Sequence, residues 1–218
     1  MIVASNVDIN DDIANLIISD DITYESSFKA YIEAKVYNRD GHLITFHRQP
    51  MKSLTLYFLA LMSALLAGTY KPASGNVAQP LLTSVFGLPS TINNSQDCAG
   101  INWDFTIQVG SGSQPFSVTL NSLAAPIANG SGQGQLEYAG WNVTYSGTTH
   151  YYTITTYNAT DSAITVTEIG LVGTIGVSCG GCSVPSSTFL LSYDTFSSPI
   201  TIPSNGLATF EIIISFIG

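Results

Sequence analysis

The chain has 218 residues, of which 45% are apolar and only 10% are charged, and its formal net charge is −9. This length allows one substantial hydrophobic core together with an extra arm. The charged fraction is far below the quarter or so that is typical of soluble domains. Because a free monomer usually carries more charge to stay dispersed, the composition favours a subunit that assembles with copies or partners.

The charges are unevenly distributed along the chain. All six basic side chains lie within the first 71 residues, and residues 72–218 contain seven acidic side chains and no Lys or Arg. Tight binding of DNA or RNA depends on Lys and Arg to neutralise phosphates. The long C-terminal region is therefore not expected to bind DNA or RNA tightly. DNA passing beside it would be repelled by its negative charge and left free to slide.

The N-terminal part begins with an acidic, irregular arm over residues 1–27. Its acidic cluster at residues 8–12 lacks the central Gly and terminal Glu of a calcium loop, so we interpret it as a solvated arm. Residues 28–37 then alternate apolar and polar side chains, which predicts a strand with one buried face. Asp40-Gly41 is a strong hairpin signal, and residues 43–47 are the return strand.

Residues 53–67 predict one long apolar helix, with Ser53 as N-cap and Gly68 as C-cap. A signal peptide starting at Met51 is an alternative. A membrane span is a third, although the stretch between Lys52 and Lys71 is short for a bilayer. We favour a buried helix that packs against a sheet or a neighbouring subunit, with contact to a membrane as a further option. The expected packing residues of this helix are Leu54, Leu56, Tyr57, Phe58, Leu61 and Leu65.

Residues 71–100 are rich in Pro, Gly, Asn and Ser and predict a long connecting loop. From residue 101 onward the chain is β in character, with turn signals between short strands. This pattern predicts one mainly β domain over residues 28–218, an antiparallel β-sandwich or jelly roll. In the last strand, Phe210, Ile212, Ile214 and Phe216 form the face expected to meet a core or a subunit. The predicted strands are residues 103–109, 116–120, 134–145, 151–157, 164–172, 188–193 and 207–216.

No motif indicates catalysis. No G-x-S-x-G elbow, H-E-x-x-H motif or P-loop is present, and nothing marks a Ser-His-Asp set. We therefore expect no enzyme activity, no catalytic residue, no cofactor and no metal site. Surface or packing roles are expected for His42, His47 and His150. The acids Asp104, Glu137, Glu168 and Asp194 could form a glycosidase pair, but surface or turn-capping roles are favoured.

Two kinds of modification site are candidates. N-x-S/T sequons place candidate glycosylation at Asn93, Asn129, Asn142 and Asn158. Cys179 and Cys182 form a C-G-G-C element in a Gly/Ser/Pro context, which favours a small loop disulfide or two free thiols over redox catalysis. With Cys98, the chain has three cysteines, which cannot all pair within one molecule.

Several segments, taken in order, resemble the virion tail and connector structural proteins of tailed phages and related viruses. The closing pair is the most informative: I-T-V-T-E-I-G-L at residues 164–171, then residues 189–216, which match an ending of the form L-L-x-R-D … P-I-x-V. Tyr193 stands where an arginine is usual, so any salt bridge made there is lost. The other segments are a strand-turn-strand at 34–47, a helix element at 53–66, the loop I-Q-V-G-S-G-S-Q-P at 107–115 and a short strand at 134–138.

The amino-acid composition, rich in Ser, Thr, Tyr and Asn and poor in Lys, most resembles that of a tail nozzle or adaptor protein of a spindle-shaped archaeal virus. This resemblance implies a virion protein that forms a homo-oligomeric ring around a DNA passage and contacts other virion proteins on the portal and tailspike sides. A host surface-layer or filament subunit is one alternative. A carbohydrate-binding module is another, although the scattered aromatic residues are better explained as strand formers.

Overall fold

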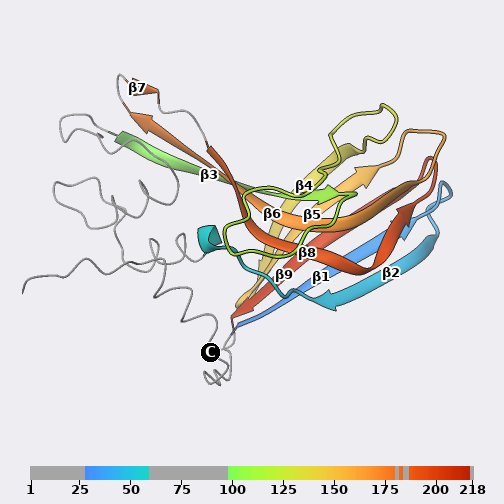
Figure 1. The fold of residues 1–218 in the computed structure, drawn as a ribbon, viewed down its shortest axis with the longest axis horizontal. Helices are drawn as coiled ribbons and strands as arrows, with labels where there is room; N and C mark the ends of the chain where they lie inside the picture. The colour runs from blue at the N-terminus through green and yellow to red at the C-terminus, as the bar shows by residue number, and fades with distance from the viewer. Residues whose placement is uncertain (1–27, 59–97, 180–181, 184–186, 217–218) are drawn as a thin grey trace, which may run out of the picture.

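The computed structural model describes residues 28–58, 98–179, 182–183 and 187–216. Within these ranges the chain is mainly β, in two antiparallel sheets (Figure 1). The sequence prediction of an antiparallel, sandwich-like β protein is confirmed at this level. The strands are β1 (Phe28–Tyr37), β2 (Leu43–Pro50), β3 (Cys98–Gly110), β4 (Glu137–Ser146), β5 (Thr149–Tyr157), β6 (Ile164–Cys179), β7 (Cys182–Ser183), β8 (Ser187–Ile202) and β9 (Leu207–Phe216).

The first sheet has five strands in the order β2-β1-β9-β5-β4, and every neighbouring pair is antiparallel. The C-terminal strand β9 lies at its centre, between β1 and β5. Alternation along β1 and β9 directs one apolar row inward, because successive side chains of a strand point to opposite faces. The inward residues Ile32, Ala34, Phe210, Ile212 and Ile214 are all buried.

The second sheet is built around β6, which pairs with β3 on one side and with β8 and the short β7 on the other. Its apolar residues share one core with the first sheet, including Ile107, Ile169, Leu191 and Phe196. Gly170 allows close packing here, because a Cβ at this position would lie 2.7 Å from the carbonyl oxygen of Ser192.

The expected long apolar helix is wrong for the described residues. Only Leu56–Phe58 are helical, beside β8 in Figure 1. Leu54 instead forms an antiparallel bridge with Ser192 of β8. Ser53 is not an N-cap, because its carbonyl oxygen accepts the N–H of Tyr193, so this part of the backbone is engaged in sheet pairing. Leu56 and Tyr57 are half-buried and Phe58 is buried, while Leu61 and Leu65 lie outside the described residues.

Several other bounds differ from the sequence prediction; for example, β6 continues to Cys179 and β8 to Ile202, beyond the predicted ends at residues 172 and 193. Residues 116–120, expected as a strand, form no strand; they belong to a loop whose Val118 carbonyl accepts the N–H of Leu56. The connecting loop was expected to reach residue 100, but β3 already begins at Cys98. The N-terminal arm, residues 1–27, lies outside the described residues.

Candidate assembly edges

An edge strand presents unpaired backbone N–H and C=O groups that can pair with another chain. The four edges of the two sheets are therefore the natural places to look for a subunit interface. In this protein the edges of the two sheets differ in how far the chain's own segments cover them, and two buried carboxylates hold some of these segments in place.

The β8 edge of the second sheet is covered by the segment that follows β2. The N–H of Thr55 donates to the carbonyl of Leu191 at 3.0 Å, and the N–H of Tyr193 donates to the carbonyl of Ser53 at 3.2 Å. The hydroxyl of Thr55, which is fully buried, donates to the carbonyl of Leu190. Residues 53–55 thus act as a short extra strand along β8.

Asp194 holds this covering segment in place. Its carboxylate accepts the backbone N–H of Lys52 at 2.9 Å, and the side chain is only 5% exposed. Burial raises the pKa of Asp194 to about 6, against the opposing effects of the Lys52 and Ser53 N–H groups and the Lys52 charge. Asp194 therefore lies in an environment that disfavours its ionised carboxylate, and the backbone N–H donors offset part of this unfavourable free energy.

Further along β8, Gln49 ties β2 to the same edge. Its amide nitrogen donates to the carbonyl of Thr195, and its amide oxygen accepts the N–H of Ser197, both at 2.9 Å. His47 contacts the Gln49 oxygen and packs edge-on against Phe196. The second half of β2 is thus bound to β8 by side chains, a role that no local sequence signal indicates.

At the opposite edge of the second sheet, the last residues of β3 are covered by residues 125–127. Ile127 donates its N–H to the carbonyl of Val109, Ser111 donates to Ala125, and Gly110 bridges Pro126. Glu168 of β6 fixes this loop: its fully buried carboxylate accepts the N–H groups of Ala124 at 3.0 Å and Ala125 at 2.7 Å. A third N–H, from Gly112, lies at 3.3 Å.

Residues from β8 also contact this loop. The hydroxyl of Tyr193 accepts the N–H of Gln114 at 2.9 Å and donates to its carbonyl at 3.1 Å. A Cβ at Gly110 would collide with the Glu168 carboxylate, so this glycine is needed for the close approach. Glu168 and Asp194, considered above as catalytic acids, are therefore both bound to backbone N–H groups.

The first half of β2 is an open edge. Among the described residues β2 pairs only with β1, and its outward apolar side chains are exposed. Phe46 is 55% exposed, and Leu43 and Ile44 are exposed to a similar degree. An edge strand with exposed apolar side chains has the features that allow pairing with another chain.

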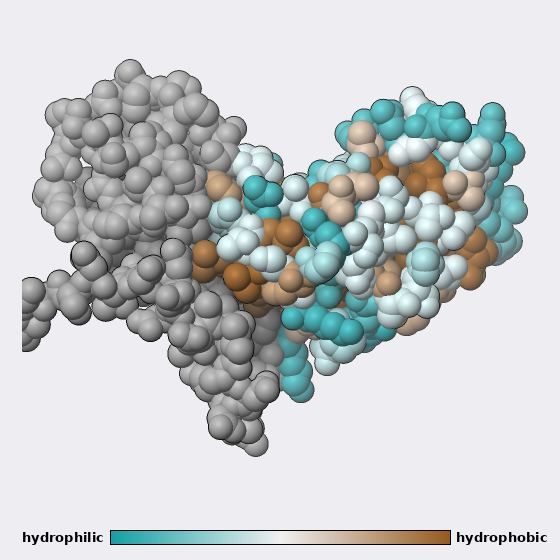
Figure 2. All heavy atoms as spheres, in the orientation of Figure 1, coloured by the Kyte–Doolittle hydropathy of each residue, from teal (hydrophilic) through white to brown (hydrophobic). Residues whose placement is uncertain are grey.

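Beyond its start, where the N–H of Tyr138 donates to Asn129 Oδ1 at 3.0 Å, the other edge of the five-stranded sheet, β4, is open in the same way. In the described part of the chain it pairs only with β5. Tyr145 is 77% exposed and Val143 is exposed too, whereas Trp141 is half-buried and stacks on Tyr152 against the core. Figure 2 shows apolar residues interrupting the polar surface on the visible face.

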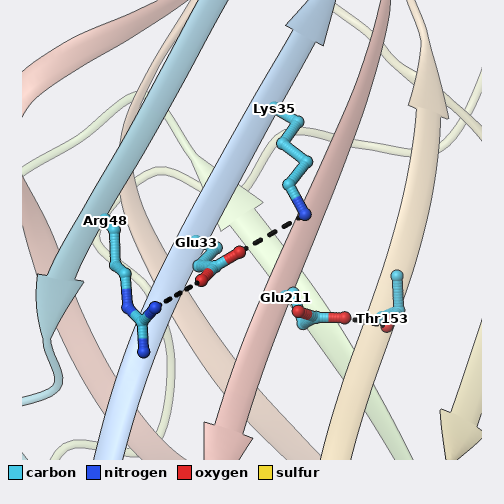
Figure 3. A network of polar contacts seen from close by, with 5 residues as sticks. All are labelled: Glu33, Lys35, Arg48, Thr153 and Glu211. Atoms are coloured by element: carbon cyan, nitrogen blue, oxygen red, sulfur yellow. Dashed lines mark hydrogen bonds and ion pairs between the residues drawn. The ribbon is translucent and has the colours of Figure 1, made fainter.

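Charge divides the two edges. Residues 28–58, which contain β1 and β2, carry five basic and two acidic side chains, whereas residues 98–216 carry six acidic and no basic ones. On the outer face near β2, Glu33 bridges Lys35 and Arg48, each at 3.3 Å, and Glu211 lies opposite it and accepts from Thr153 (Figure 3). Residues 28–58 thus carry a net positive charge, and β4 belongs to the anionic part of the chain, with Glu137 as its only charged residue.

The predicted modification sites fall in different environments. Asn129 and Asn142 are exposed. Asn158 is fully buried and its amide nitrogen donates to three backbone carbonyls, so a glycan there would not fit the folded chain. Asn93 lies outside the described residues. Cys179 and Cys182 are opposite each other in the β6–β7 pairing.

Comparisons with protein-family models, with curated proteins and with solved structures found no match. Within the described ranges, no group of three or more His, Cys, Asp or Glu side chains is arranged to hold a metal ion. A search of the same ranges found no helix with the length and apolar character needed to span a membrane.

Proposed function

We propose that this chain is a structural subunit that assembles with copies of itself through the open edges of its five-stranded sheet, as a tail nozzle or adaptor of a virion. The observation that carries the proposal is the contrast between edges. Parts of the β3 and β8 edges are covered by the chain's own segments, while β2 and β4 keep exposed apolar residues on strands that pair on one side only among the described residues.

The charges favour contact between unlike edges. If two β2 edges met, two cationic hairpins would face each other, and like charges across an interface are costly. A β2 edge meeting a β4 edge brings the cationic part of one copy to the anionic part of the next. Such a head-to-tail contact repeats from copy to copy and closes into a ring when the rotation allows.

The strand directions are compatible with a ring. Because all five strands are antiparallel to their neighbours, β2 and β4 run in the same direction. A rotation about an axis along the strands preserves that direction, so β4 of one copy would meet β2 of the next as a parallel pair. Parallel pairs are slightly less stable per residue than antiparallel pairs. We therefore expect the exposed apolar side chains to contribute to the stability of the contact.

The assignment to a viral tail rests on the sequence resemblance and on charge. A subunit without any cation from residue 98 to 216 offers no partner to phosphates, as suits a passage through which DNA must slide. The non-enzymatic role agrees with the engagement of Glu168 and Asp194 by backbone N–H groups.

The test is the mass and symmetry of the full-length protein at high concentration. Light scattering and electron microscopy should find a multi-subunit assembly with rotational symmetry. Phe46→Glu and Tyr145→Glu place an acid at each open edge, and each should shift the protein to smaller species. Phe116→Glu is the matched control, because Phe116 is 42% exposed but lies in the β3–β4 loop, and its assembly should be unchanged.

A monomeric wild-type protein at high concentration would overturn the proposal. A symmetric dimer would overturn the head-to-tail contact, because it requires like edges to pair. Retention of the wild-type mass by both edge variants, with unchanged circular dichroism, would move the interface elsewhere on the molecule.

A further inference from the structure

The strand register aligns residues of the two open edges with each other. Directly opposite residues on neighbouring strands point to the same face of a sheet, so cross-strand rows can be followed over all five strands. One row of the outer face begins at Phe46 in β2 and ends at Gly140 in β4. Its members are Phe46, Lys35, Thr209, Thr155 and Gly140.

A second row of the same face lies two residues further along β2. It consists of Arg48, Glu33, Glu211, Thr153 and Asn142, and Figure 3 shows all of them except Asn142. The β2 edge thus presents Phe46 followed by Arg48, and the β4 edge presents Gly140 followed by Asn142. Both pairs lie at the same two levels of the sheet and run in the same direction.

Gly140 leaves room for an aromatic ring at the β4 edge. It is exposed, and a Cβ built on it would meet no atom of the described residues beyond its chain neighbours closer than the Cβ of Thr155, at 4.0 Å. A glycine inside a strand often marks a place where another chain approaches closely, and an aromatic ring over an edge glycine supplies the missing side-chain packing. Phe46, which is 55% exposed, is the ring at the same level.

Arg48 retains hydrogen-bond donors for a neighbouring chain. Its Nη1 binds Glu33 at 3.3 Å and its side chain is 50% exposed, while a guanidinium has five N–H donors in all. Asn142 is exposed, and its amide oxygen can accept one of them. Because β4 contains no Lys or Arg, no cation of this strand repels the guanidinium.

We propose that β2 of one copy pairs with β4 of the next in the register that places Phe46 beside Gly140 and Arg48 beside Asn142. A closed ring has no rise along its axis, so residues at the same level of the sheet meet when the strands run along that axis. The start of β4 takes no part, because Asn129 already binds the N–H of Tyr138. This inference rests on the proposed head-to-tail assembly and adds the residue pairs that define the contact.

Disulfide trapping tests the register in the full-length protein. Opposite Cα atoms of neighbouring strands lie ~4.8 Å apart, within the range that disulfides span. Phe46→Cys and Gly140→Cys proteins are mixed, their mass is measured, and the mixture is oxidised in a glutathione buffer, digested and mapped by mass spectrometry. The expected product links position 46 of one copy to position 140 of the next.

Phe46→Cys mixed with Asn142→Cys is the matched control for the trapping. An offset of two residues adds about 6.7 Å along the strand and places the Cα atoms more than ~7 Å apart, too far for a disulfide. This mixture should therefore form no link between positions 46 and 142.

A change of charge at position 142 tests the same register without altering Phe46. Asn142→Lys places an ammonium group beside Arg48 of the next copy and should weaken assembly by at least about tenfold, since like charges across an interface are costly. Asn142→Asp offers a carboxylate there and should assemble at least as strongly as the wild type. Ser113→Lys adds the same charge to an exposed residue of the β3–β4 loop and should leave assembly unchanged.

A dominant link between positions 46 and 142, or equal assembly of Asn142→Lys and Ser113→Lys, would overturn the register and leave the assembly itself in place. A glycan on Asn142 in assembled copies would do the same, because it would occupy the contact. A wild-type protein that is monomeric would instead overturn the proposed function, and the mass measured before oxidation separates the two results. Circular dichroism of each variant identifies a failure to fold.

Discussion

The edges of the two sheets differ in how far other segments of the chain cover them. In the smaller sheet, residues 53–55 cover the middle of β8 and residues 125–127 cover the end of β3, and the buried carboxylates of Asp194 and Glu168 fix these segments. In the five-stranded sheet, β2 and β4 keep exposed apolar side chains at their outer positions. The chain covers parts of the edges of one sheet with its own segments and leaves apolar edge residues of the other exposed, which is why assembly is the function we propose.

The largest expected effect comes from opening the covered β3 edge with Glu168→Gln. A glutamine keeps one acceptor oxygen but turns an NH2 group toward backbone N–H donors, so at least one buried donor loses its partner. We expect the free energy of unfolding to fall by about 2–4 kcal/mol, since hydrogen bonds to charged groups are the stronger ones. Urea denaturation measures this change.

Glu137→Gln is the control for this prediction, because Glu137 is a half-exposed acid at the start of β4. Its effect on the free energy of unfolding should stay within about 0.5 kcal/mol. Equal losses in the two variants would show that the Glu168 carboxylate does not hold the loop.

A smaller effect, visible in the pH dependence, is expected from Asp194→Asn at the covered β8 edge. Because burial raises the pKa of Asp194 to about 6, the folded state holds its proton more tightly than the unfolded state does. The stabilisation that this group contributes is present below its unfolded pKa and is lost as the pH rises through about 6. Asparagine cannot ionise and therefore lacks this loss.

The difference in unfolding free energy between Asp194→Asn and the wild type should consequently shift in favour of the variant by about 1–2 kcal/mol between pH 4 and pH 8. Urea denaturation at several pH values measures it. A pH-independent difference, or a shift in favour of the wild type, would contradict the assigned role of burial at this carboxylate.

The smallest effect is expected on the outer face beside the open β2 edge. Arg48 binds Glu33 at 3.3 Å and lies over the Tyr31 ring, but its side chain is 50% exposed. Exposed ion pairs contribute little, so Arg48→Met should lower the free energy of unfolding by less than about 1 kcal/mol. A loss above about 2 kcal/mol in urea denaturation would mean that this face is as tightly built as the covered edges.

The regular strands were predictable because their signals are local. Alternation along residues 28–37 and the Asp40-Gly41 turn define the β1–β2 hairpin, and alternation in residues 207–216 defines β9. An apolar run without alternation does not distinguish a helix from a covered strand, since the same Leu- and Ala-rich pattern suits both. The run that begins at Ser53 therefore predicts a helix, although β8 binds residues 53–55 as an edge strand.

The roles of the carboxylates could not be read from the sequence. Glu168 binds N–H groups 43, 44 and 56 residues away, and Asp194 binds one 142 residues away. Nothing near either acid in the chain indicates such partners. The exposure of apolar residues in β2 and β4 could not be predicted from the sequence either, because only the strand order shows which strands lie at an edge.

The segregation of basic residues has a consequence for proteolysis. Trypsin cuts only after Lys and Arg, and within the described ranges these residues lie solely in β1, in the turn after it, in β2 and at Lys52. A trypsin digest therefore reports the local opening of this hairpin and is blind to the rest of the fold, even when that part unfolds. If neighbouring copies cover the hairpin, assembly should slow the cleavage while leaving chymotryptic sites far from the open edges unaffected.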